Sequence, residues 1–146
     1  MNRRDVLGAA IGGASLVIAM DKAFAAEEHH HEHAASGPST ALSEAARHCV
    51  SSGDACVSHC LQLFTQGDTT TAACAKSVYQ MTAVCEALAR LASANSEHVA
   101  AFAKIAHTIC LDCEKECRKH ENEHAICKTC AESCAACADE CKKVSA

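Results

Sequence analysis

Small or apolar residues recur every three or four positions from residue 41 to the end of the chain. This period is typical of helices with one buried face, and it is interrupted only near 67–68, 93–96 and 120–123. We therefore expect helices over 41–66, 70–92, 96–119 and 123–143. Asp68, Asn95 and Asn122 are the expected N-caps of the last three helices. Because short loops place consecutive helices side by side, the pattern predicts an all-α fold, an antiparallel up-down four-helix bundle.

The first 25 residues have the order of a secretory signal peptide. Arg3-Arg4 precede an apolar run from Val6 to Met20, and Ala23-Phe24-Ala25 is a small-x-small cleavage site. The paired arginines predict export by the twin-arginine route and hence a periplasmic location. The apolar run is short for a membrane span, so we expect no stable span in the mature chain.

Residues 26–40 show no apolar period and contain four histidines within 29–33. We expect a disordered, His-rich tail there. The remaining residues, 41–146, then form the single bundle domain.

The composition of the bundle domain is dominated by its thiols, since 13 of the 146 residues are cysteine and only 3% are aromatic. Within each predicted helix the cysteines stand at helical spacings, which place them on one face. They are Cys49, Cys56 and Cys60 in the first, Cys74 and Cys85 in the second, Cys110, Cys113 and Cys117 in the third, and Cys127, Cys130, Cys134, Cys137 and Cys141 in the fourth. The segment 123–143 has almost no large aliphatic residue to bury, so the sequence predicts a cysteine-lined core.

Three chemistries could account for such a core. Cysteine can serve as a small apolar residue, but thirteen of them in place of leucine would leave the bundle underpacked. A disulfide framework is a second possibility, although neighbours on one regular helix seldom meet disulfide geometry and an odd number cannot pair completely. The third is a soft metal, for which thiolates are the preferred ligands.

Among the soft metals, the stripe of thiols favours Cu(I). Zinc prefers closed four-ligand sites, usually formed by loops, whereas adjacent turns of a helix suit linear or trigonal coordination. One Cu(I) per thiolate also leaves the core neutral, so several ions per chain, up to about one per cysteine, are expected. Metallothionein-like sequestration of zinc, cadmium or copper is the alternative function.

Other function classes lack support in the sequence. A net charge of −5 argues against a nucleic-acid partner. No general base stands out as the centre of an active site, so we expect a binding protein and not an enzyme.

Antiparallel packing would gather Cys60, Cys74, Cys117 and Cys127 at one end of the bundle, where we expect copper to enter. The other end would be closed by hydrocarbon from Leu88, Leu91, Val99, Phe102 and Ile105. Three histidines near the thiol end and one methionine between the cysteines of the second helix are further candidate ligands, since imidazole and thioether groups also suit copper. They are His59, His120, His124 and Met81.

From Thr40 to Ala146 the chain resembles the copper storage proteins, in particular their exported branch. The elements that carry the resemblance are His48-Cys49, Cys56-x-x-His59-Cys60, Cys110-x-x-Cys113-x-x-x-Cys117 and the series from Cys127 to Cys141. The resemblance implies a four-helix bundle that stores Cu(I), assembles into a homotetramer and supports copper supply in methane-oxidising bacteria, with a partner protein or chelator removing the copper. It also implies that His59 coordinates copper at the open end. Some relatives have methionines there, whereas this chain has Leu63, Gln66 and Thr71, so no methionine-lined entrance is expected.

Overall fold

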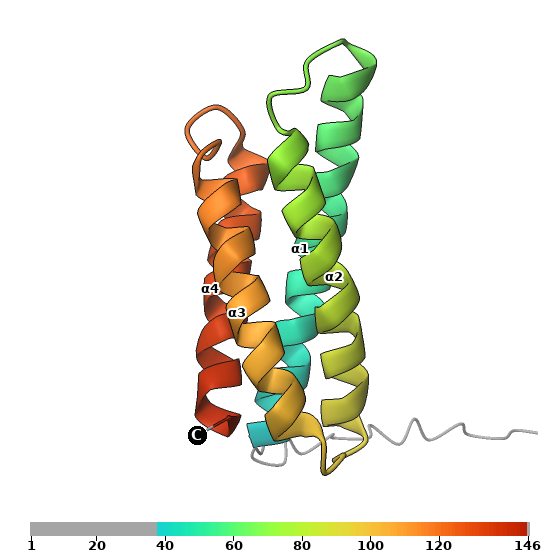
Figure 1. Ribbon diagram of the computed structural model, residues 1–146, viewed down its shortest axis with the longest axis vertical. Coiled ribbons are helices and arrows are strands. Elements are labelled where there is room, and N and C mark those ends of the chain that lie inside the picture. The colour runs from blue at the N-terminus through green and yellow to red at the C-terminus, as the bar shows by residue number, and fades with distance from the viewer. Residues whose placement is uncertain (1–37, 146) are drawn as a thin grey trace, which may run out of the picture. The chain divides into compact units, whose positions relative to one another are not determined.

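The computed structural model describes residues 38–145, which form four helices and connecting loops (Figure 1). The helices are α1 (Pro38–Thr65), α2 (Ala72–Ser93), α3 (Val99–Arg118) and α4 (Ala125–Val144). The predicted all-α class is confirmed, and each helix end lies within three residues of the predicted position. The periodic pattern therefore located every helix of this part of the chain.

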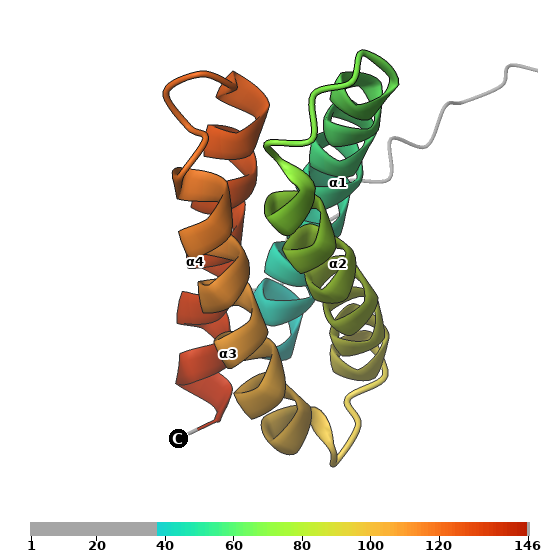
Figure 2. The same ribbon diagram turned by 45° about the horizontal axis from the view of Figure 1, so that its top comes forward.

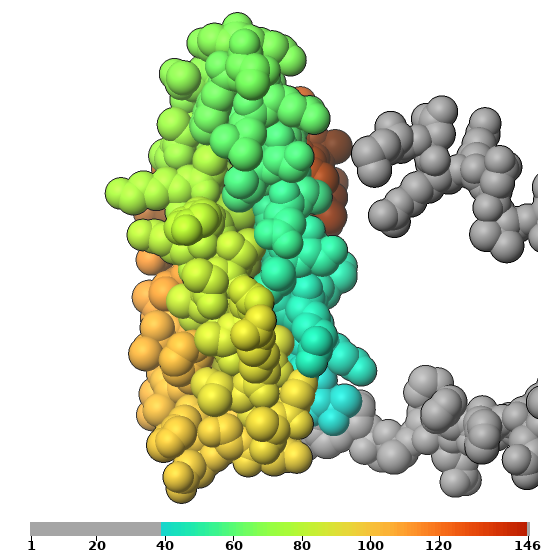
Figure 3. All heavy atoms as spheres, turned by 90° about the vertical axis from the view of Figure 1, so that its right-hand side faces the viewer, coloured from blue at the N-terminus to red at the C-terminus, as the bar shows by residue number. Residues whose placement is uncertain are grey.

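The four helices form an antiparallel bundle in which each packs against two others. α1 packs against α2 and α4, and α3 packs against the same two helices. The loops 66–71 and 119–124 lie at one end, and the loop 94–98 lies at the other with the C-terminal end of α4 (Figures 1 and 2). The predicted up-down bundle is confirmed. Seen from outside, the side chains of α1 and α2 form one continuous surface (Figure 3).

The predicted N-caps are wrong. Thr71, His98 and His124 precede α2, α3 and α4, and none of these three side chains caps its helix. Asp68 instead accepts hydrogen bonds from the backbone N–H and the hydroxyl of Thr70, at 2.9 and 2.7 Å, inside the loop. Asn95 has a positive φ of 49° just after α2. Asp68 therefore stabilises a turn within its loop, and α2 begins only at Ala72.

The boundary between the tail and the bundle also differs from the prediction. α1 begins at Pro38, so residues 38–40 belong to the helix and not to the tail. Proline is compatible with the first turn of a helix, where its missing N–H would have no intrahelical partner. The signal peptide, its cleavage site and the rest of the tail lie outside the described residues. Between residues 38 and 145, no helix combines the length and apolarity needed to cross a bilayer.

A glycine allows α1 and α2 to approach each other closely. A Cβ atom at Gly53 would lie 2.5 Å from Cγ2 of Thr82 and 2.8 Å from Cε of Met81. Both distances are shorter than real Cβ contacts allow. The missing side chain of Gly53 therefore makes room for two residues of α2.

Candidate metal centre

The core of the bundle is made largely of thiols. All thirteen cysteines are free and have no exposed surface. The largest fully buried apolar side chains are Leu42, Val78, Met81 and Leu88, and alanines fill much of the remaining core. The predicted cysteine-lined core is confirmed, and it carries no disulfide among the described residues.

The sulfur atoms form four groups, within each of which all sulfurs lie within 4.8 Å of one another. The groups are Cys49, Cys85, Cys110 and Cys137; Cys56, Cys74 and Cys127; Cys56, Cys117 and Cys130; and Cys113, Cys130 and Cys134. Cys56 and Cys130 each belong to two groups, and Cys49 Sγ lies 3.7 Å from Cys134 Sγ. The groups thus follow one another along the bundle as a connected series of sulfur ligands.

Two of the thirteen predicted cysteine ligands lie outside these groups. Cys60 lies one turn beyond Cys56 in α1, and Cys141 lies one turn beyond Cys137 in α4. Both cysteines are fully buried. They therefore extend the series of sulfurs toward its two ends.

Most close sulfur pairs join different helices. Cys74 Sγ lies 3.4 Å from Cys117 Sγ, and Cys85 Sγ lies 3.5 Å from Cys110 Sγ. Each of these pairs links α2 to α3. A soft ion bound between two such thiolates would be held by two helices, so ion binding would reinforce the packing of the bundle.

Hydrogen bonds with neighbouring thiols lower the pKa of Cys74 and raise that of Cys117, whereas burial acts to raise the pKa of both. Burial raises the pKa of Cys60, and it is the main cause that raises the pKa of Cys127 to about 12. The hydrogen bond with the Cys117 thiol lowers the pKa of Cys74 to about 3. A thiolate in this core is therefore stabilised only where an adjacent S–H group, or a bound cation, compensates its charge.

The end of the bundle with the loop 94–98, here called the aliphatic end, is closed by hydrocarbon. Leu42, Leu88 and Val99 are buried there, and Leu91 and Phe102 pack against them. The sequence analysis did not place Leu42 in this layer. It did place Ile105 there, but the Ile105 side chain is 54% exposed. Its prediction is wrong because Ala103 and Ala106 take the inward positions of that turn of α3.

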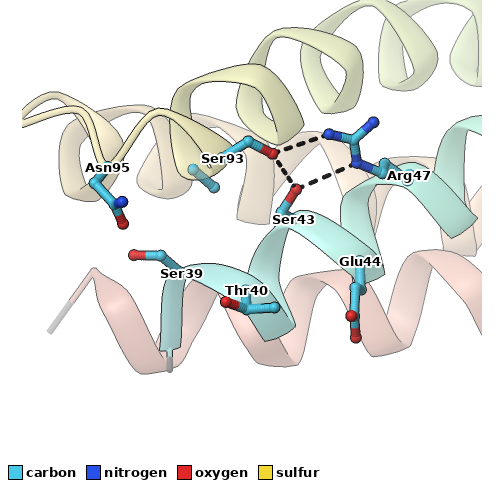
Figure 4. Close-up of a pocket in the computed structure, with 8 residues that line it drawn as sticks. Ser39, Thr40, Ser43, Glu44, Arg47, Ser93 and Asn95 are labelled. Atoms are coloured by element: carbon cyan, nitrogen blue, oxygen red, sulfur yellow. Dashed lines mark hydrogen bonds between the residues drawn. The ribbon is translucent and has the colours of Figure 1, made fainter. Parts of the chain in front are cut away.

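A polar cluster joins α1 to α2 at the aliphatic end (Figure 4). The Arg47 side chain donates to Ser93 Oγ at 2.9 Å and to Ser43 Oγ at 3.3 Å. Ser43 Oγ donates to the Ala89 carbonyl at 3.1 Å. These hydrogen bonds join the N-terminal part of α1 to the C-terminal part of α2. The aliphatic end is therefore stabilised by polar as well as apolar contacts.

The opposite end, here called the sulfur end, carries a histidine pair. His59 Nε2 lies 3.1 Å from His124 Nδ1, and both rings are half-buried. His59 directly precedes Cys60, so the pair is next to the first thiols of the core. His120 is half-buried in the adjoining loop and is not part of the pair. The structure thus brings two of the three predicted histidines together.

Thr71 is a residue at the sulfur end whose environment was not predicted. Its side chain is fully buried, and its hydroxyl has no hydrogen-bond partner. It stands directly before α2 and one turn before Cys74. The only feature of the sequence that could have indicated the burial of Thr71 is its position one turn before Cys74, the first buried cysteine of α2. With Thr71 and the histidine pair in place, no cysteine reaches the surface at this end either.

The family model for copper storage proteins matches residues 35–146. The chain belongs to the copper storage protein family. Its sulfur groups can bind several Cu(I) ions, because they supply overlapping sets of soft ligands. No curated protein sequence matches this copper storage protein significantly.

Solved structures of copper storage proteins share the fold. The apo form of copper storage protein 3 from Bacillus subtilis is 25% identical, with a TM-score of 0.64 over 74% of this chain and 99% of that one. A cytosolic copper storage protein from Streptomyces lividans, with five coppers, is 28% identical, with a TM-score of 0.65 over 74% of this chain and 92% of that one. A structure of the Streptomyces lividans protein loaded with ten copper equivalents is also 28% identical, with a TM-score of 0.65 over 74% of this chain and 83% of that one.

Proposed function

We propose that this copper storage protein is a non-enzymatic store that holds Cu(I) on the thiolates of its core, up to about one ion per cysteine. The observation that carries the proposal is the connected series of sulfur groups, in which thirteen buried thiols share one interior. The related Streptomyces lividans protein loaded with ten copper equivalents supports a capacity of this order.

Charge balance supports a monovalent ion as the cargo. Each thiol that binds Cu(I) releases its proton to solvent, and the thiolate and the ion then cancel in charge. A divalent ion at the same ratio would leave a large positive charge in a buried core. Thiolates that belong to two groups, such as Cys56 and Cys130, can bridge two ions and so permit the high ratio.

The route for loading is the sulfur end. Cys60, Cys74, Cys117 and Cys127 lie near this end, whereas hydrocarbon and the Arg47 cluster close the aliphatic end. The His59–His124 pair is half-buried, so its nitrogens lie between solvent and the thiols. Imidazole nitrogens bind copper, and the pair can receive an ion before it passes to Cys60.

The test of storage is an anaerobic titration of the reduced, copper-free chain with Cu(I) in the presence of a competing chelator. We expect on the order of ten or more tightly held ions per chain. Saturation at one or two ions would exclude a store. Repeating the titration with Zn(II) and Cd(II) separates the alternative, since metallothionein-like sequestration predicts that these ions compete effectively with Cu(I).

Export and assembly complete the proposal. The twin-arginine signal in residues 1–25 would carry the folded protein to the periplasm, and the family resemblance supports a homotetramer. A reporter fused to residues 1–26 tests the route. Export that persists after Arg3-Arg4 are replaced by Lys-Lys would contradict it, and sedimentation of the processed chain tests the tetramer.

A further inference from the structure

Met81 places a thioether sulfur inside the thiol core. It is the only methionine among the described residues, and its side chain is fully buried. The Cys49 thiol donates to Met81 Sδ across a distance of 3.1 Å. Between residues 38 and 145, the sulfur–sulfur hydrogen bonds of the cysteines are longer, from 3.4 to 4.0 Å.

The position of Met81 in α2 repeats the cysteine spacing of α1. Cys49, Cys56 and Cys60 follow one another at steps of seven and four, and so do Cys74, Met81 and Cys85. Met81 is therefore the middle member of the series in α2, as Cys56 is in α1. With Met81 included, α2 presents three sulfurs on its inward face, as α1 does.

The close approach at Gly53 holds the thioether in this orientation. The Met81 methyl carbon occupies space that a Cβ of Gly53 would enter, at 2.8 Å. The methyl group thus packs toward the backbone of α1, while the sulfur contacts Cys49. A methionine that only filled space would not need its sulfur on the thiol side of the core.

We propose that Met81 Sδ is a fourteenth sulfur ligand of the store and binds one Cu(I) together with Cys49 and Cys134. The proposal rests on the proposed storage function. Cys49 Sγ lies 3.1 Å from the Met81 sulfur and 3.7 Å from the Cys134 sulfur, so it is the shared neighbour of both. A thioether is a soft ligand without charge, so it adds a bond to the ion without disturbing the neutrality of the core.

The loading step is an exchange of thiol protons for a metal ion. In the copper-free protein the Cys49 thiol lies within hydrogen-bond distance of both Met81 Sδ and Cys134 Sγ. On loading, the S–H bonds of Cys49 and Cys134 break and each proton leaves to solvent, while Cu(I) forms bonds to both thiolates and to Met81 Sδ. Cys134 also belongs to the group with Cys113 and Cys130, so its thiolate bridges to an ion bound there, which balances the second negative charge. Copper remains Cu(I) throughout, and no sulfur is oxidised or reduced.

Selenium absorption spectroscopy tests this ligand directly. The full chain is prepared with selenomethionine, loaded anaerobically with Cu(I) to saturation, and measured at the selenium K edge. We expect a copper neighbour at bonding distance from selenium, which is absent before loading. The Met81→Leu chain, a swap that conserves volume, should lack this neighbour. The Met20→Leu chain should retain it.

The outcomes separate the two proposals. If the chain binds many Cu(I) ions but no selenium–copper neighbour appears at any loading, Met81 is a core filler and the inference is overturned while storage stands. If only one or two ions bind, storage itself fails. The Met20→Leu chain carries selenium only at Met1 and Met81. If this chain shows no selenium–copper neighbour, the inference is overturned even when Met81→Leu does not fold.

Discussion

At the residue scale, one closely packed position in the bundle is a residue without a side chain. Gly53 faces α2 where Thr82 and Met81 approach the backbone of α1. Neither neighbour can move freely, because Thr82 is β-branched and the Met81 sulfur is engaged with Cys49. The packing of α1 on α2 and the orientation of Met81 therefore depend on one glycine.

We predict that Gly53→Ala destabilises the copper-free protein although alanine is the better helix former. Overpacking costs typically ~1–3 kcal/mol, whereas the gain in helix propensity is at most ~1 kcal/mol. Urea denaturation of the reduced protein, followed by circular dichroism, measures the difference. Ser51→Ala, an exposed change in the same helix, is the control. Equal midpoints for the two variants would contradict the close approach.

The histidine pair leads to a kinetic prediction. Replacing His59 by asparagine should slow Cu(I) transfer from a chelator several-fold and leave the final capacity nearly unchanged, because the thiols remain. Stopped-flow loading under anaerobic conditions measures the rate. His98→Asn is the matched control, since His98 is exposed at the aliphatic end. If both variants load at the wild-type rate, copper does not pass the histidine pair.

At the scale of the element, α4 contributes five of the thirteen thiols but not five equivalent ones. Cys130 belongs to two sulfur groups, with partners from α1 and α3. Cys141 belongs to none. The position of a cysteine along the helix therefore determines how many Cu(I) ions its thiolate can bind.

Two single substitutions in α4 test whether Cys130 and Cys141 differ in the number of ions that they bind. We predict that Cys130→Ala lowers the Cu(I) capacity by about two ions and Cys141→Ala by about one at most, since a bridging thiolate serves two ions. The chelator titration of each variant gives the number directly. Equal losses would show that the groups do not share thiolates.

The cysteine faces were predictable from sequence because a helical period and a soft side chain are local properties. Steps of three and four assign every cysteine to one face without knowledge of the neighbouring helices. The start of each helix was less predictable, because Asp68 stabilises a turn in its loop and Asn95 adopts a positive φ just after α2 instead of capping α3. The Arg47 cluster and the His59–His124 contact join residues 46 and 65 positions apart, and no local pattern indicates such pairs.

At the scale of the whole molecule, the two ends of the bundle have different chemistry. Leucine, valine and phenylalanine close the aliphatic end, while histidine and threonine cover the sulfur end. Between them, thiols take the place of the usual hydrocarbon core. Because cysteine is smaller than leucine, the copper-free bundle gains less from burial, and bound ions would add bonds between helices.

Loading should accordingly raise the thermal stability of the whole chain. A ligand that binds only the folded state stabilises it by about 2.7 kcal/mol at a hundred times its dissociation constant. For a bundle of this size we expect an increase in Tm of more than about 10 °C. Calorimetry of the copper-free and copper-loaded protein measures it, and stripping the copper with a chelator should restore the lower value. An unchanged Tm would mean that the ions do not connect the helices.

The complete burial of the thiols also governs what reagents can do to the empty protein. A maleimide or a peroxide can attack a thiol only after the bundle opens, since no cysteine has exposed surface. The rate of alkylation thus reports the opening equilibrium of the folded chain. The thiols are therefore most accessible to these reagents before the chain folds.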